Sequence, residues 1–214
     1  MTINKREAIR YLGFGKQQPD EVTIALIDQC AEEISQTAEC RHTVRRFPLT
    51  FSEDGMPKAA GIELQSRSLA RNLLGCEEVI FMAATLGPRP DRLMNLYSKI
   101  QISKAAVLQA TAAAAIEDYC NSIQRDIEKK INAEGLYLRP RYSPGYGDLS
   151  LAVQPEFLNV LDAAKQAGIV LSEGGVMIPE KSVTAIMGIS RINSKCHIEG
   201  CESCNNTDCA FRRN

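Results

Sequence analysis

The chain has 214 residues, of which 44% are hydrophobic and 24% charged, as is ordinary for a globular protein with one sizeable core. Its formal net charge of -1 argues against the broad basic surface of a nucleic-acid-binding protein. Charges stand where a signal peptide would need its apolar core, and no window approaches the roughly 20 apolar residues of a membrane helix, so we expect a cytoplasmic protein without membrane contact.

Two helices are expected at the start of the chain. Asn4 and Glu7 have the spacing of a capping box for a short first helix, and a second helix opens at Asp20. The apolar residues of the second helix share one face at helical spacing: Leu26, Ile27, Cys30, Ala31 and Ile34. Alternating hydrophobic residues at 47–51 then predict a strand, and Pro48 favours a place for it at the edge of a sheet.

The rest of the chain alternates helices, strands and one irregular loop. The predicted elements are a short strand at 61–64, a helix at 66–74, a buried strand at 79–83, a helix at 91–96, a long helix at 103–133, a loop at 139–149, a helix at 155–167, apolar segments at 170–171 and 176–178, and a strand at 183–189. The long helix carries an alanine run at 112–115, which favours close packing against a sheet over the approach of a ligand.

The loop has the composition of a ligand-binding segment. Either Arg139 or Arg141 offers paired donors that grip a carboxylate. Tyr142 and Tyr146 offer flat faces for an adenine or a sulfonium cation, and Gly145 lets the backbone approach a ligand closely. The same composition also fits a proline-stiffened surface turn, so composition alone does not decide between the two interpretations.

Several kinds of catalytic chemistry are absent from the sequence. It contains no Walker loop, no serine nucleophile elbow and no complete dinucleotide fingerprint. Neither His42 nor His197 has the neighbours of a nucleophile triad or of a histidine-based metal site. We therefore assign no catalytic residue, and whether the chain is an enzyme stays open.

Three motifs in the same order resemble the activation domain of cobalamin-dependent methionine synthase. The stretch Arg141 to Tyr146, RYSPGY, resembles the family's Arg-Pro-Ala-Pro-Gly-Tyr loop. Residues 157–173 resemble the helix, turn and strand that follow this loop, and residues 176–185 resemble the Ala-Met-Trp-Pro and Ser-Val-Ser-Gly stretches. The resemblance spans 79–189 and is carried by the order of the motifs as well as by their residues.

The chain departs from this family at identifiable positions. Ile178 stands where the family has a tryptophan, and the family's long helix bears glutamates where this chain has mostly alanine, followed by Glu117 and Asp118. No motif before Val79 is matched residue by residue. Because the cobalamin, folate and homocysteine domains of the synthase have no counterpart here, we expect a stand-alone version of the activation domain.

The resemblance implies both a fold and a ligand. We expect a single α+β domain at 1–190, with a twisted, mostly antiparallel sheet flanked by helices, followed by a cysteine-rich C-terminal tail at 191–214. In the family, the loop binds S-adenosylmethionine, with the arginine on the methionine carboxylate and loop backbone groups on the amino group and adenine. The resemblance carries cofactor binding to five loop residues: Arg141, Tyr142, Ser143, Gly145 and Tyr146.

The resemblance also implies a task, the reductive methylation that reactivates a corrinoid protein. An electron carrier such as flavodoxin or ferredoxin reduces cob(II)alamin, and the methyl group of S-adenosylmethionine then traps the reduced cobalt. The cobalamin would come on a partner, a methionine synthase that lacks its own activation domain or a related corrinoid protein. The alternatives are an iron–sulfur electron-transfer protein and a non-catalytic docking module for a corrinoid protein.

Four cysteines crowd into the tail with the pattern Cys196-x4-Cys201-x2-Cys204-x4-Cys209. Without a signal peptide, such a cluster favours metal or redox chemistry over a disulfide framework. Four thiolates can surround one zinc ion or one iron–sulfur cluster, and the Cys201-x-x-Cys204 pair has the spacing at which two sulfurs share a metal. Structural zinc, an iron–sulfur cluster and cysteines without metal all remain open.

Overall fold

The chain opens with two helices whose capping residues are those predicted. The computed structural model describes residues 3–15 and 17–193. The side chain of Asn4 accepts a hydrogen bond from the Arg6 amide at the start of α1 (Lys5–Tyr11). Asp20 caps α2 (Glu21–Thr37) in the same way, with 2.8 Å between its carboxylate and the Thr23 amide nitrogen.

Six strands of the described chain form one sheet in the order β3-β2-β1-β4-β8-β5, and each neighbouring pair is antiparallel. The strands are β1 (Arg41–Phe51), β2 (Pro57–Ala59), β3 (Ile62–Glu63), β4 (Cys76–Thr85), β5 (Tyr137–Leu138) and β8 (Ser182–Ser190). β1 begins six residues earlier than the predicted strand at 47–51, because its first half is rich in arginine and lacks the alternation of a half-buried strand. Pro48 is the last residue of β1 before β2 joins its outer side.

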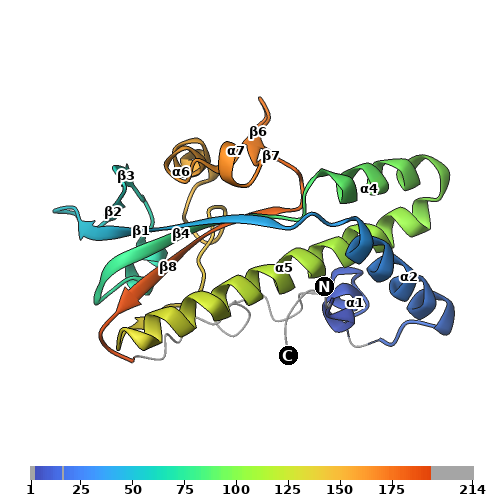
Figure 1. The fold of residues 1–214 in the computed structure, drawn as a ribbon, viewed down its shortest axis with the longest axis horizontal. Coiled ribbons are helices and arrows are strands. Elements are labelled where there is room, and N and C mark those ends of the chain that lie inside the picture. Colours follow the sequence, from blue (N-terminus) through green and yellow to red (C-terminus); the bar gives the residue numbers. More distant parts are fainter. Residues whose placement is uncertain (1–2, 16, 194–214) are drawn as a thin grey trace.

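The remaining elements cover both faces of this sheet. They are α3 (Arg67–Asn72), α4 (Pro88–Ile100), α5 (Ile102–Ala133), a 3-10 turn (Leu151–Val153), α6 (Gln154–Val160), α7 (Ala163–Gln166) and the small hairpin of β6 (Val170–Leu171) and β7 (Met177–Ile178). Figure 1 shows α1, α2 and α5 below the sheet and α6, α7 and the hairpin above it. None of the described helices combines the length and apolar character that crossing a bilayer requires.

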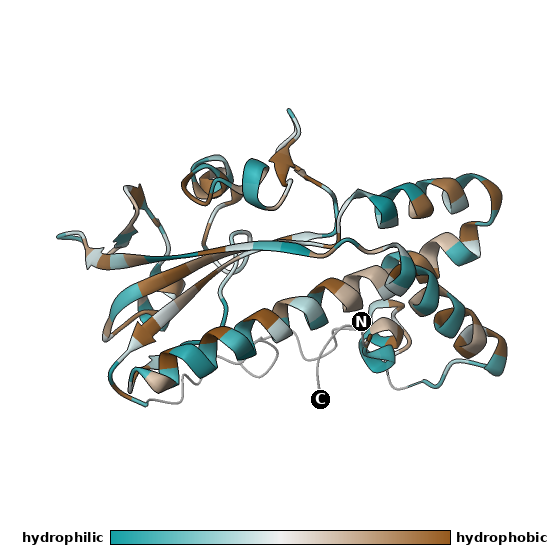
Figure 2. Ribbon diagram, viewed as in Figure 1, coloured by the Kyte–Doolittle hydropathy of each residue, from teal (hydrophilic) through white to brown (hydrophobic). Residues whose placement is uncertain are grey.

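The central strand β4 divides the core into two layers. Its side chains alternate, so that Ile80 and Met82 pack with α5 and α2, whereas Val79 and Phe81 pack with α3, α6 and α7. Figure 2 shows hydrophobic residues recurring along β4, β8 and α5, where these layers meet. The alanine run of α5 belongs to the first layer, with Ala112, Ala114 and Ala115 fully buried, which agrees with the close packing predicted from its composition.

Two of the predicted helices differ most from the observed elements. α4 begins three residues before the predicted start, since Gly87 with φ of 82° turns the chain out of β4 and Pro88 occupies the first helical position. The helix predicted at 155–167 is divided into α6 and α7, because Asp162 adopts a left-handed conformation with φ of 50°. The break turns the chain before the β6–β7 hairpin.

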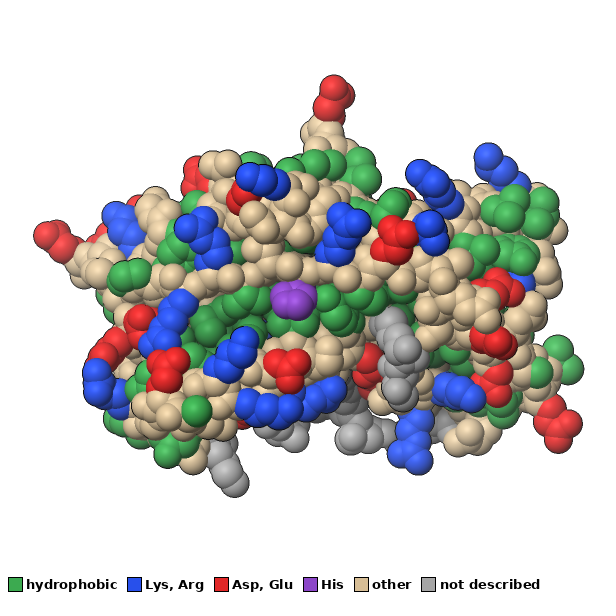
Figure 3. All heavy atoms as spheres, in the orientation of Figure 1, with side chains coloured by type: hydrophobic (Ala, Val, Ile, Leu, Met, Phe, Trp, Pro, Cys, Tyr) green, Lys and Arg blue, Asp and Glu red, His purple; other side chains and the backbone are tan. Residues whose placement is uncertain are grey.

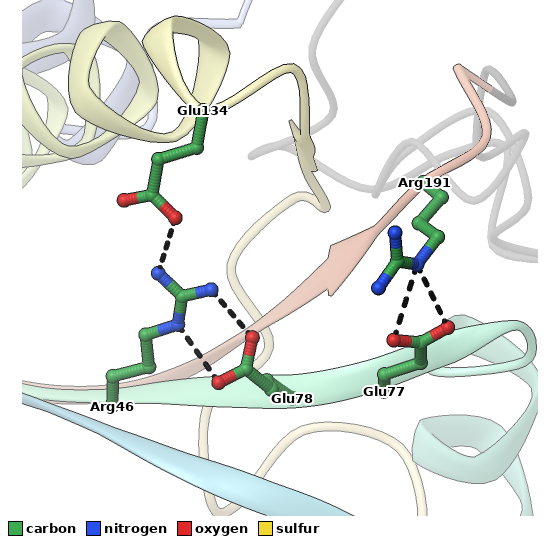
Figure 4. A network of polar contacts seen from close by, with 5 residues as sticks. All are labelled: Arg46, Glu77, Glu78, Glu134 and Arg191. Carbon is green, nitrogen blue, oxygen red and sulfur yellow. Dashed lines mark hydrogen bonds and ion pairs between the residues drawn. The ribbon is translucent and has the colours of Figure 1, made fainter.

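An ion-pair network fixes the C-terminal end of α5 to the sheet. The Arg46 guanidinium of β1 contacts Glu78 of β4, and its Nη1 lies 2.7 Å from a carboxylate oxygen of Glu134, the residue that follows α5. Arg191, just after β8, pairs with Glu77 at 3.1 Å (Figure 4). The two acidic neighbours Glu77 and Glu78 therefore each pair with an arginine of their own, beside one hollow at the start of β4.

Candidate functional site

The loop at 139–149 begins as a continuation of the sheet and then changes register. β5 and Arg139 pair with β8 as far as Gly188, and Tyr142 pairs again with Ile186 through two backbone hydrogen bonds of 2.8 Å. The pairing shifts by one residue in between, at Pro140 and Arg141, where proline has no amide hydrogen to offer. Such a shift re-aims side chains, and here it turns Arg141 toward α5.

Arg141 is held against α5 by two residues one helical turn apart. Its Nη2 donates to Asn121 at 2.9 Å and forms an ion pair with Glu117 at 3.2 Å. The buried Nη1 donates to none of the described residues. Tyr11 of α1 lies close by: burial raises the pKa of Tyr11, and the Glu117 carboxylate raises it further. In the Arg141 guanidinium, Nη2 is thus held by Glu117 and Asn121, whereas Nη1 has no partner among the described residues.

The loop then forms a tight turn around Gly145. The Tyr146 amide donates to the Ser143 carbonyl at 3.1 Å, and the Gly145 amide donates to the Leu149 carbonyl at 2.8 Å. Gly145 has φ of 91°, a conformation that favours glycine, and a Cβ there would lie 3.1 Å from Leu151. Tyr146 is 67% exposed at the tip of this turn.

Tyr142 supports the loop from the face of the sheet opposite to Arg141. Its ring packs against the core layer under α3 and α6, and its hydroxyl donates to the Tyr146 carbonyl at 3.2 Å. A Cβ at Gly147 would lie only 2.4 Å from this hydroxyl, and Gly147 has φ of 54°. Glycine at 147 is therefore required both by the turn and by the position of Tyr142.

Asp148 ties the end of the loop to the start of α3. Its carboxylate accepts hydrogen bonds from the Ser66 hydroxyl and from the backbone amides of Arg67 and Ser68. These bonds, led by the one from Ser66, lower the pKa of Asp148 to about 2. The carboxylate stays charged and fixes one end of the loop, while Tyr142 fixes the other.

The structure separates the two arginines that the sequence left as alternatives. Arg139 is 8% exposed and its Nη2 lies 3.4 Å from the Leu74 carbonyl, on the α3 side of the sheet. Arg141 lies on the α5 side. Glu117 follows the alanine run in the sequence, and the structure gives it the position facing the loop, together with Asn121. No motif of the sequence indicated Asn121, because its spacing from Glu117 is common to every helix.

Two hollows of the described surface lie away from the 139–149 loop. One hollow of about 310 Å³ lies between α6, α7 and β6, and another of about 260 Å³ lies beside the Arg46 network. Neither is lined by a residue of the 139–149 loop, and the Arg141 side chain is 15% exposed. Within 3–15 and 17–193, no cluster of three or more His, Cys, Asp and Glu side chains is placed to hold a metal ion. Four predicted metal ligands lie outside the described residues: Cys196, Cys201, Cys204 and Cys209.

Comparison with solved structures matches most of the chain. A crystal structure of the MetH reactivation domain bound to AdoHcy superposes with a TM-score of 0.60, covering 85% of this chain and 70% of that chain at 15% sequence identity. This chain has the fold of that reactivation domain. The resemblance that the loop motifs indicated is thus confirmed at the level of the fold, as is the α+β class with its antiparallel sheet. No protein-family model matches the sequence, and no curated protein matches it.

Proposed function

We propose that the chain binds S-adenosylmethionine at the 139–149 loop and supports the reductive methylation of a cobalamin-containing protein. The observation that carries this proposal is Arg141, oriented by Glu117 and Asn121 with its buried Nη1 lacking a described partner. It is supported by the fold, since a solved domain of the same fold binds AdoHcy, the S-adenosylhomocysteine that remains after methyl transfer.

In this proposal, different loop residues contact different parts of the ligand. Arg141 supplies a charged donor for the methionine carboxylate, and Glu117 beside it supplies an acceptor for the amino group. Backbone groups of Ser143 and Gly145 lie in the turn where the ligand would approach, and the exposed ring of Tyr146 offers a face for the adenine. Tyr142 contributes through its support of the turn.

The proposed chemistry needs orientation more than acid or base groups. One electron from a carrier converts cob(II)alamin into cob(I)alamin, whose electron pair forms the new bond to the methyl carbon. The bond from that carbon to the sulfonium sulfur breaks with its electrons, leaving S-adenosylhomocysteine. Because the sulfonium already activates the methyl group, the protein's part is to place it and to exclude competing reactions.

Calorimetric titration with S-adenosylmethionine, and with S-adenosylhomocysteine alongside, tests the binding. We expect saturable binding at one site for both ligands. Arg141→Ala should weaken it by roughly 1.5–3 kcal/mol, the scale of a hydrogen bond to a charged group. Arg125→Ala, which removes an exposed arginine of α5, the helix that holds Arg141, is the matched control and should leave the affinity unchanged. A folded chain that binds neither ligand contradicts the proposal.

A reactivation assay tests the second half of the proposal. A methionine synthase without its activation domain, oxidised to cob(II)alamin, is incubated with a reductant, S-adenosylmethionine and this chain. We expect the absorption spectrum of methylcobalamin to develop only when the chain is present. If this spectrum does not develop although S-adenosylmethionine still binds, the proposed ligand stands and the proposed reactivation of a corrinoid protein is contradicted.

Binding of zinc or of an iron–sulfur cluster at the cysteine tail, as opposed to cysteines without metal, remains a prediction. Thiolate ligands suit either zinc or an iron–sulfur cluster. Purification without oxygen, followed by metal analysis, distinguishes them, because a cluster gives a brown protein with iron and sulfide, whereas zinc gives a colourless one. Cys201→Ser should lower the bound metal in either case, and Cys76→Ser, a cysteine of β4, should not.

A further inference from the structure

Strand β1 has a long edge without a neighbour. Its residues 41–48 pair with β4 on one side, and β2 joins the other side only at Leu49–Phe51. No other described strand pairs with that outer side, which we call the open edge (residues 41–48). In an antiparallel strand, alternate residues direct their N–H and C=O groups outward, so the open edge presents a row of backbone donors and acceptors.

The charge of the open edge is positive on one face. β1 contains three arginines and no acidic residue, whereas the whole chain has a net charge of -1. Arg46 points toward α5 and is neutralised by Glu78 and Glu134 (Figure 4). Arg45 points to the opposite face, where its Nη1 donates to the Val160 carbonyl at 2.6 Å and no described acid neutralises it. Arg41, exposed, lies on the same face as Arg45 by the alternation of the strand.

Below the open edge lies a furrow with apolar walls. Val44 of β1 and Tyr119 of α5 are partly buried there, against the core layer between sheet and helix. The Nδ1 of His42 lies 2.7 Å from the Tyr119 hydroxyl, and the two rings meet edge to face. Figure 3 looks onto this side of the molecule and shows hydrophobic side chains in the hollow between the sheet and α5, around the histidine, with basic side chains on the sheet side and both basic and acidic ones on the α5 side.

We propose that the open edge binds an extended acidic segment of a partner protein by strand addition. The backbone of the segment pairs with β1, its acidic side chains face Arg41 and Arg45, and the apolar side chains between them enter the furrow beside Val44 and Tyr119. The alternation of the sheet dictates this pattern, since side chains at odd and even positions of an added strand reach opposite faces.

A second copy of this chain is a poor occupant of the same edge. Two β1 strands paired edge to edge would bring arginines of both copies together, and like charges across a strand pair are destabilising. The inserted residues would also be those of β1 itself, which has no acidic side chain to offer Arg41 or Arg45. Charge complementarity therefore selects an acidic partner and disfavours a homodimer at this edge.

This inference does not rest on the proposed S-adenosylmethionine site. Tyr119 lies on one flank of α5, whereas Glu117 and Asn121, which hold Arg141, lie on the other, as residues two apart on a helix point in nearly opposite directions. A partner on the open edge and a ligand at Arg141 thus contact the same helix without sharing residues.

The probe for this edge is a synthetic peptide of alternating glutamate and valine, as long as the open edge and labelled for fluorescence anisotropy. We expect saturable binding that weakens with added salt, slower hydrogen exchange of amides in 41–47, and no binding of a matching lysine–valine peptide. A peptide with alternate backbone nitrogens methylated should not bind, because methylation removes the donors of a strand pair. Binding of the methylated peptide, or no binding of the unmodified one, overturns the proposal.

Charge reversal locates the binding on the protein. Arg41→Glu combined with Arg45→Glu should weaken the glutamate–valine peptide by about tenfold or more, as for the loss of complementary charges at an interface. Arg92→Glu, at an exposed arginine of α4, is the control and should change little. Equal affinity in the double variant contradicts the proposal. A dimer in sedimentation experiments that the double variant abolishes would assign the edge to a second copy and overturn it as well.

Discussion

At the scale of single residues, Asp148 holds the end of the 139–149 loop in place. The carboxylate is exposed, yet three donors from Ser66, Arg67 and Ser68 converge on it. Ser66 is also the N-cap of α3, with its side chain 2.9 Å from the Leu69 amide nitrogen. The Ser66 hydroxyl therefore donates to Asp148 and accepts from the Leu69 amide at the same time. The position of the loop depends on the start of a short helix that is far from it in sequence.

Replacement of Asp148 should show this dependence. Asp148→Ala removes all acceptors and should lower the free energy of unfolding by about 1 kcal/mol, the scale of a lost helix cap, with solvent limiting a larger effect. Asp148→Asn keeps one acceptor and should lose less. Urea unfolding followed by circular dichroism measures both, and a larger loss in the Asn variant than in the Ala variant would contradict the assignment.

The pH dependence of this contribution follows from the sign of the shift. The pKa of Asp148 is lowered to about 2, below its ordinary value of 3.8, so folding favours the charged form. The stabilisation is complete above pH of about 4 and is lost as the pH falls toward 2. The difference in unfolding free energy between the native chain and Asp148→Asn should therefore shrink over this range. If the difference in unfolding free energy stayed constant over this pH range, it would not arise from the charge of Asp148.

At this scale the sequence predicted the loop but not its supports. The composition of 139–149 fitted either a ligand-binding segment or a stiffened surface turn, and the family resemblance pointed to Arg141 together with four other loop residues. The direction of the Arg141 side chain depends on a one-residue register shift against β8, which no local pattern reveals. Asn121 and Asp148 likewise meet their partners only after α5 and α3 have packed on the sheet.

At the scale of elements, a buried lysine joins three helices. Lys104 of α5 has a side chain 4% exposed, and its Nζ lies 2.6 Å from a Glu33 oxygen of α2 and 2.9 Å from the Tyr97 hydroxyl of α4. The ammonium also lies 4.0 Å from the centre of the Tyr97 ring. Burial lowers the pKa of Lys104, but the bonds from Glu33 and Tyr97 outweigh it, so the net pKa is raised and the charge is kept.

Removal of this lysine should cost more than removal of an exposed one. Lys104→Met leaves the Glu33 carboxylate without its cationic partner, with only the Gln29 amide still donating to it, and should lower the free energy of unfolding by roughly 2–4 kcal/mol, since the other carboxylate oxygen is buried without a hydrogen bond. Lys129→Met breaks the exposed pair with Asp126 and should cost less than about 1 kcal/mol. Adding Glu33→Leu to Lys104→Met should recover part of the loss. Chemical denaturation measures all variants, and equal losses for the two lysines would refute the cluster.

The elements themselves were predictable to different degrees. Helices with polar caps, such as those at Asn4 and Asp20, and the apolar strand at 79–83 follow from local patterns that tertiary packing reinforces. The first half of β1 does not, because it lacks the alternation of a half-buried strand and becomes a strand through its pairing with β4. The division between α6 and α7 rests on the left-handed backbone of Asp162, a residue type that also occurs inside helices.

At the scale of the whole molecule, the two core layers share one strand. Phe81 of β4 faces the upper layer, where its ring stacks on Phe157 of α6 with the centroids 4.4 Å apart, and Met82 faces the lower layer under α5. β4 and β8 contribute side chains to both layers. A partly folded chain that kept only one layer would still need both strands. It would then expose to water the apolar faces of these strands that belong to the unfolded layer, which is unfavourable.

The two layers should therefore unfold together. Phe81→Ala and Met82→Ala each leave a cavity, in the upper and lower layer respectively, and should lower the unfolding free energy by about 3–5 and 2–5 kcal/mol. Val22→Ala, at a side chain 77% exposed on α2, serves as the control and should have little effect. In each variant, far-ultraviolet circular dichroism should report a single transition that coincides with the one seen by near-ultraviolet dichroism of the tyrosines. Separate transitions in the Phe81 variant would mean that the layer under α5 stays folded alone, and β4 would then not be the element that unites the domain.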